Sequence, residues 1–192
     1  MIKNILAFIG TIALIAVIGM GVKFGGMMSK AAQLDPGAMP AYMKMFTDVL
    51  NTGDAAKAMV LEYKVDKDVS NDDVAESVKA LVENNNMRLT GDVKMFTKED
   101  AKPNEVKHAR IFSMCSLPIA KKFLNFSHAY GGFMPCRVML IEMGNGDRFL
   151  YTMDLTLMIH GGHTLPPEML ALAQKVQAAM EGIASRAAKG DF

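Results

Sequence analysis

Two cysteines are the residues of this 192-residue chain whose type and setting could support chemistry. Cys115 lies just before a run of apolar residues at helical spacing over 119–124, and Cys136 opens a predicted strand. The free amide hydrogens and the positive dipole end of a helix N-terminus favour a thiolate, so Cys115 could be reactive. The alternative is an inert core residue, because buried cysteine without reactivity is common.

Two further groups of residues are candidates for a metal site and a ligand pocket. The turn over 160–163 carries His160 and His163, and neutral imidazoles at this spacing could converge on one metal ion. No Asp, Glu or Cys in that turn completes a ligand set, so ordinary polar surface histidines are the alternative. Candidate pocket residues surround the glycine pair at 131–132: His128, Tyr130, Phe133 and Met134.

The N-terminal segment has the composition of a membrane anchor. Residues 5–22 contain no charge, with Lys3 before them and Lys23 after them, and 18 residues is near the lower limit for a membrane-spanning helix. The alternative is a cleaved signal peptide, which usually has a shorter apolar region followed closely by small residues. The flanking lysines balance, so charge does not determine orientation. We therefore assign residues 1–23 to an anchor or signal segment, and prefer the N-terminus in the cytoplasm.

The remaining chain divides into a linker region and one α+β domain. Residues 24–40 are rich in glycine and proline and predict a tether, which with a short amphipathic helix makes up residues 24–54. Strands and helices cluster over 55–192 without strict alternation, which favours an antiparallel sheet with a central hairpin packed by two or three helices. The predicted elements are strands over 59–65 and 87–95, a helix over 70–84, hairpin strands over 137–143 and 148–159, and a last helix from 166.

Local signals support several of these boundaries. Ser70 and Asp73 have the spacing of a capping box at the start of the first helix of the domain. Gly91 suggests a bulge in the second strand. The Asn145-Gly146 dipeptide predicts the hairpin turn, because these two residues tolerate positive φ at both turn positions.

The segments around the two cysteines resemble the bacterial family called domain of unknown function 302. In that family a Cys-Asn-Pro step opens a helix and a Leu-Pro-Cys step opens a strand. Cys115, Pro118, Pro135 and Cys136 match this pattern, whereas Ser116 and Leu117 depart from Asn-Pro and Met134 replaces Leu. The resemblance covers roughly residues 55–192, and the chain looks like a membrane-attached branch of the family. It implies an α+β fold of the TATA-binding-protein-like class and a homodimer, but no chemistry.

The matched motifs also lead us to expect that Cys115 and Cys136 lie close together. In an oxidising compartment they could form one disulfide, and a pair somewhat farther apart could share a metal or act separately.

Composition excludes some functions and leaves others open. Lys plus Arg number 21 and Asp plus Glu 20, which argues against nucleic-acid binding by phosphate neutralisation. The 18 methionines allow thioether ligation of a soft metal or haem, but their places on apolar faces favour core packing. We expect a module of the bacterial inner membrane, with its soluble domain in the periplasm. It would bind a small ligand, metal or haem, or assemble with a partner complex, without catalysis. The alternative is a thiol-based redox or sulfur-handling accessory that uses Cys115 and Cys136.

Overall fold

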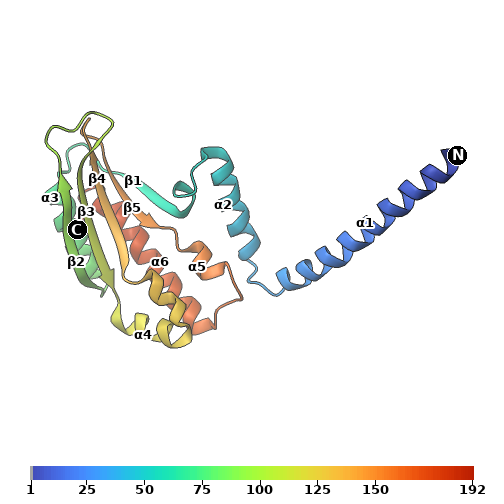
Figure 1. The fold of residues 1–192 in the computed structure, drawn as a ribbon. Helices are drawn as coiled ribbons and strands as arrows, with labels where there is room; N and C mark the ends of the chain where they lie inside the picture. Colours follow the sequence, from blue (N-terminus) through green and yellow to red (C-terminus); the bar gives the residue numbers. More distant parts are fainter. Residues whose placement is uncertain (1) are drawn as a thin grey trace.

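The computed structural model describes the backbone of residues 2–192. Side chains at 2, 4–9, 12, 13, 16, 20, 22 and 23 lie outside the described set. A long helix, α1, projects from an α+β body (Figure 1). In chain order the elements are α1 (Ile2–Ala31), α2 (Ala38–Thr52), the 3-10 helix η1 (Lys57–Met59), β1 (Val60–Lys64), α3 (Asn71–Asn84), β2 (Arg88–Thr97), β3 (Val106–Cys115), α4 (Leu117–Phe126), the 3-10 helix η2 (His128–Phe133), β4 (Cys136–Met143), β5 (Arg148–Met153), α5 (Thr156–His160) and α6 (Pro167–Ala187).

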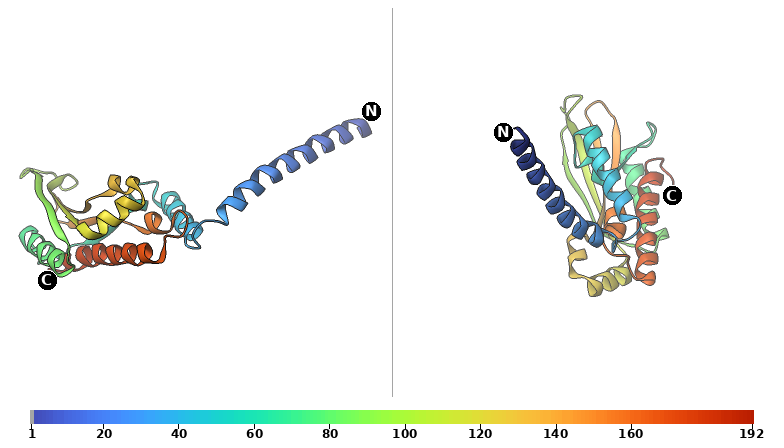
Figure 2. Two further views of the ribbon diagram at one scale, coloured as in Figure 1. Left: turned by 90° about the horizontal axis from the view of Figure 1, so that it is seen from below. Right: turned by 90° about the vertical axis from the view of Figure 1, so that its right-hand side faces the viewer.

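The predicted α+β class is confirmed. Within the described residues, one antiparallel sheet has five strands in the order β1-β5-β4-β3-β2, with the β4–β5 hairpin inside it. Helices α3 and α6 pack together against one face of the sheet (Figures 1 and 2). Period-two alternation along the strands directs apolar side chains to that face. The resulting core includes fully buried Val78, Leu81, Phe112, Leu140, Leu150 and Ile183.

Two local predictions of the sequence are confirmed in the first half of the body. Ser70 caps α3 by accepting a hydrogen bond from the Asp73 amide at 3.1 Å, and the Asp73 carboxylate accepts one from the Ser70 amide. Aspartate therefore replaces glutamate in a complete capping box. The β2–β3 register shifts between Leu89 and Gly91, where the bulge was predicted.

Strand β3 was missed because its buried face is partly charged. His108 and Arg110 are buried beside Phe112 and Met114, so the strand lacks a simple apolar alternation. Arg110 donates two hydrogen bonds to the Asp92 carboxylate of β2, at 2.7 and 2.8 Å. This contact lowers the pKa of Asp92, chiefly through the hydrogen bonds from Arg110. The carboxylate on the neighbouring strand compensates the free-energy cost of burying the Arg110 charge. The spacing of residues along the chain does not reveal this partner.

Two predicted boundaries are wrong. The second hairpin strand does not continue to Ile159, because β5 ends at Met153 and the short helix α5 follows. The tether over 24–40 is also mostly helical, since α1 continues to Ala31 and α2 begins at Ala38. Gly25, Gly26 and Pro40 of this region lie within helices, whereas Pro36 and Gly37 lie in the irregular turn over 32–37.

Helix α1 contains the predicted membrane anchor. It is continuous over 30 residues and has no acidic residue in its first turn. Much of the predicted span, 5–22, lies at positions whose side chains are outside the described set. Among the described residues, no helix meets the combined requirement of length and apolarity for a membrane crossing.

The β4–β5 turn is at the predicted position but has a different conformation. Gly146 donates to the Met143 carbonyl at 2.9 Å, and the Met143 amide donates to the Asp147 carbonyl at 2.8 Å. Of the turn residues, only Gly146 has positive φ, at +87°. This pattern matches a three-residue loop in which one residue has the left-handed conformation. The prediction of positive φ at both Asn145 and Gly146 is therefore wrong.

We expect Gly146→Val to lower the free energy of unfolding by about 1 kcal/mol or more, because a β-branched residue is strained at this φ. Denaturant unfolding of the full chain in mild detergent measures the change. Gly182→Ala is the matched control, because Gly182 lies in α6 and a Cβ there meets nothing within 4 Å. The control should gain about 0.5 to 1 kcal/mol. Equal stabilities for the Gly146 variant and the parent chain would contradict the assigned turn.

Candidate functional site

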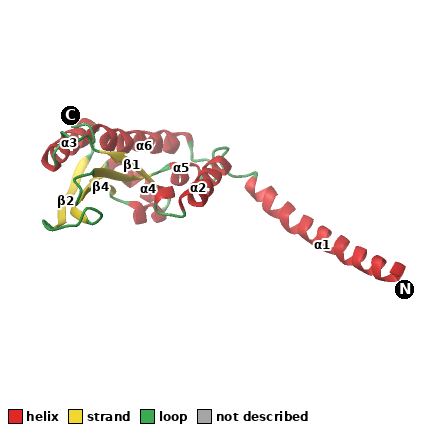
Figure 3. Cartoon of the chain, turned by 90° about the horizontal axis from the view of Figure 1, so that it is seen from above, coloured by secondary structure: helices red, strands yellow, loops and turns green. Residues whose placement is uncertain are grey.

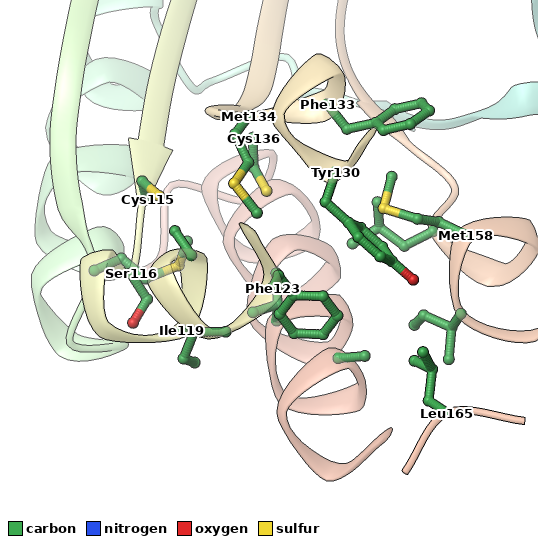
Figure 4. A pocket seen from close by; sticks show the side chains of 16 residues that line it. Cys115, Ser116, Ile119, Phe123, Tyr130, Phe133, Met134, Cys136, Met158 and Leu165 are labelled. Carbon is green, nitrogen blue, oxygen red and sulfur yellow. The ribbon is translucent and has the colours of Figure 1, made fainter. Parts of the chain in front are cut away.

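An apolar pocket lies where β3 and β4 meet the helices at one end of the sheet (Figure 4). It contains about 620 Å³ of space, part of it open to solvent. Side chains reach it from α4, η2, α5 and α6 and from the ends of the two strands. Its lining consists of Met87, Cys115, Ser116, Ile119, Ala120, Phe123, Tyr130, Phe133, Met134, Cys136, Leu155, Met158, Ile159, Leu165, Ala173 and Val176.

The two cysteines lie close together, as predicted, and both line this pocket. Cys136 opens β4 and is paired with Met114, the residue before Cys115 at the end of β3. Both side chains line the pocket from these adjoining strand ends (Figure 4). Both thiols are free and half-buried. The antiparallel register of β3 and β4 therefore creates the proximity that the sequence led us to expect.

The thiols are not activated as the sequence suggested. Burial raises the pKa of Cys115, and burial together with the nearby Cys115 raises the pKa of Cys136 to about 11. Helix α4 begins at Leu117, with Ser116 at the cap position, so Cys115 lies outside the first turn. The dipole effect falls off within that turn, and desolvation dominates instead. The prediction that the helix start lowers the pKa of Cys115 is therefore wrong.

Aromatic residues of α4 and η2 form part of the pocket wall. Phe123 of α4 and Tyr130 of η2 are in edge-to-face contact, with ring centroids 5.0 Å apart. Burial raises the pKa of Tyr130. Phe133 and Met134 also line the pocket, but His128 does not and is exposed. His128 is the first residue of η2, so three of the four candidate pocket residues meet and the fourth faces outward.

His160 and His163 bind the turn that follows α1. The His160 Nδ1–H donates to the buried Asp35 carboxylate at 3.0 Å, and the His163 Nδ1–H donates to the Gln33 carbonyl at 2.8 Å. The pKa of Asp35 is lowered mainly by a hydrogen bond from the Gly37 amide. Among the described residues, no three His, Cys, Asp or Glu side chains gather as a metal site. Metal binding by His160 and His163 stays a prediction.

Several pocket residues were not predicted as site residues. Met158 and Ile159 lie on α5, which the sequence suggested was a strand, and Ala173 and Val176 lie on α6, the last helix that the sequence predicted. The same apolar periodicity describes a buried helix face and a pocket wall. These four residues line a pocket only because the elements packed around them leave a space, which the sequence does not show.

Raised thiol pKa values predict slow alkylation at neutral pH. Because the thiolate fraction is reduced below each pKa, reaction with iodoacetamide should rise about tenfold per pH unit between pH 7 and 9. Cys115 should react faster than Cys136, whose pKa is about 11. Peptide mass spectrometry distinguishes the two sites, and Cys115→Ser and Cys136→Ser are the controls. A rate that reaches its plateau below pH 8 would contradict the burial effect.

Comparison with known proteins identifies a structure with the same fold and the family of the chain. The chain shares its fold with the crystal structure of an uncharacterized conserved protein DUF302 from Bacillus stearothermophilus. The two are 13% identical with a TM-score of 0.50, and the match covers 66% of this chain and 95% of the other. No curated protein matches the chain. The model of the family described as domain of unknown function DUF302 matches residues 61–187, which include the sheet except its first residue, both cysteines and the whole of α6. The chain therefore belongs to the DUF302 family, as the motifs around Cys115 and Cys136 indicated.

Proposed function

We propose that this protein is a membrane-anchored binding module that holds an apolar small molecule in the pocket beside Cys115 and Cys136. The observation that carries the proposal is the chemistry of the lining. None of the sixteen described residues that line the pocket bears a charge at neutral pH, and its hydroxyl groups come from Ser116 and Tyr130. Apolar walls with a few polar groups are typical of small-molecule sites.

The lining also narrows the ligand class. The carboxylates of haem, or a hard cation that prefers oxygen ligands, would meet no charged partner among the described lining residues, and desolvating such groups without a partner is costly. An uncharged, partly aromatic or aliphatic molecule would bury its surface against Phe123, Ile119 and Met158. Its single polar group could reach the Tyr130 hydroxyl or the Ser116 side chain.

Attachment to the membrane through α1 is part of the same proposal. Supporting it are the uncharged run over 5–22 and the continuous helix Ile2–Ala31, which is about 45 Å long at 1.5 Å per residue. Described apolar residues of α1 are also exposed, including Leu14 and Ile18 at 61% and 57%. We propose the bacterial inner membrane, with the body in the periplasm, as the location of this module.

Ligand binding predicts a specific variant effect. A long-chain alcohol that occupies the pocket should raise the unfolding temperature of the full chain in detergent, because it binds the folded state alone. Ala120→Leu fills part of the pocket and should abolish the shift, whereas Ala171→Leu, on the exposed side of α6, should retain it. An equal shift in both variants would contradict ligand binding at this pocket.

Membrane insertion predicts retention after alkaline carbonate extraction. The native chain should stay in the membrane pellet. Introducing two charges with Leu14→Asp and Ile18→Asp should release it, because each charge at a helix centre costs about 3 kcal/mol of insertion free energy. Release of the native chain into the supernatant would argue against the anchor. The far-ultraviolet circular dichroism of the released variant checks that the body remains folded.

Thiol chemistry is the second candidate function, and the shared position of Cys115 and Cys136 at one pocket supports it. We rank thiol chemistry second because thiol exchange proceeds through the thiolate, and the raised pKa values of Cys115 and Cys136 reduce the thiolate fraction at neutral pH. The homodimer implied by the family resemblance, and assembly with a partner complex, stay predictions.

A further inference from the structure

Helix α2 carries an exposed apolar stripe on the side facing away from the body. The stripe consists of Met39, Met43, Phe46 and Leu50, with exposed fractions of 52%, 55%, 56% and 67%. Spacings of four, three and four residues place these side chains along one line of a helix. Among the described residues of the body, this is a run of four large apolar side chains with no covering element.

The opposite side of α2 packs on the body. Ala38 and Ala41 are buried, and Ala41 and Met45 lie beside Leu157 of α5. At 100° per residue, the stripe residues fall within about 40° of the direction opposite Ala41. The stripe therefore points away from α5 and the sheet.

Helix α2 also lies across the direction of α1, between α1 and the body (Figures 1 and 3). Hydrogen bonds hold the turn between the two helices. The Asp35 amide donates to the Gly162 carbonyl at 2.8 Å, and the Tyr42 hydroxyl donates to the Gly161 carbonyl at 2.9 Å. The His160 contact with Asp35 adds a third link. Two of these contacts come from the turn and one from Tyr42 of α2, and all three reach residues 160–162, so the position of α2 relative to the end of α1 is constrained.

From this geometry we propose that α2 lies on the surface of the bilayer, with the stripe inserted at the boundary between headgroups and acyl chains. The inference rests on the proposed anchoring by α1, because a helix across the direction of a spanning helix lies parallel to the membrane plane. Phe and Leu on one side are typical of interfacial helices. The stripe bears no charge, and Lys44, the one cation of α2, pairs with Asp48 at 2.8 Å. Insertion of apolar side chains, rather than attraction to anionic lipid, therefore drives the contact.

A second copy of the chain is a less suitable partner for the stripe. Helix α2 has 15 residues, about two heptads, whereas a coiled coil is usually sustained over three to four heptads. A bilayer surface requires no matching seam. The bilayer surface would also lie on the side of the body from which α1 projects.

The chain contains no tryptophan, so one substitution supplies a unique fluorescent reporter. The full chain carrying Phe46→Trp is reconstituted in phosphatidylcholine vesicles, with and without lipid brominated near the headgroup end of its acyl chains. We expect a blue-shifted emission and strong quenching by the brominated lipid, unchanged when anionic lipid or salt is added. Phe96→Trp is the matched control, since Phe96 is 49% exposed and belongs to β2. Strand β2 lies on the side of the body away from α1 (Figure 1), so this reporter should respond to aqueous acrylamide only.

A third reporter separates failure of this inference from failure of the anchor. Leu14→Trp should be quenched by lipid brominated deep in the acyl chains if α1 spans the bilayer. Deep quenching of Leu14→Trp, with Phe46→Trp as accessible to acrylamide as Phe96→Trp, would overturn the surface position of α2 and leave the anchor intact. Absence of lipid quenching at Leu14→Trp would overturn both. Protection of Phe46→Trp from acrylamide without lipid quenching would assign the stripe to a second copy and also overturn the proposal.

Discussion

The contact between α6 and the sheet is the interaction on which the rest of the structure depends. In its C-terminal half, Met180, Ile183 and Ala184 are buried in the same core as Leu140 and Leu150 of the sheet. Burial of each large apolar side chain contributes roughly 1.5 to 3 kcal/mol. The same helix also contacts α4 and α5. One helix of 21 residues therefore both closes the core and holds the elements that form the pocket.

The pocket takes its chemical character from this arrangement. The ends of β3 and β4 bring Cys115 and Cys136 to a space whose other walls are apolar helix faces. Burial there raises the pKa of both thiols, so the environment that suits an apolar ligand also keeps the cysteines protonated at neutral pH. The raised pKa values of both thiols are the reason that the proposed ligand binding ranks ahead of thiol exchange.

The loop after α5 connects the pocket with the N-terminal helices. Met158 and Ile159 line the pocket, and the next residue, His160, binds Asp35 in the turn after α1. His163 binds the same turn through the Gln33 carbonyl. The two histidines that the sequence marked as metal candidates thus have a structural role as hydrogen-bond donors. Their loop holds α1, α2 and the body in one arrangement, which is the basis for the proposed position of α2 on a bilayer.

Local sequence signals identified much of the fold. The α3 capping box, the bulge at Gly91 and the place of the hairpin turn depend on neighbours a few residues apart, and each is confirmed. The family motifs around the cysteines likewise located the end of the sheet where the pocket lies. Strand β3 was missed, since the burial of Arg110 is compensated by Asp92 on another strand.

The sequence by itself determined the α+β class, the uncharged N-terminal run and the residues around the two cysteines, because these depend on short-range periodicity and motif spacing. Only the tertiary structure decided that Ala173 and Met158 face the same pocket, that His160 binds Asp35, and that the stripe on α2 faces outward. It also reversed the expected pKa shift of Cys115, because desolvation depends on every element packed around a thiol, whereas a helix-start motif records only its neighbours along the chain.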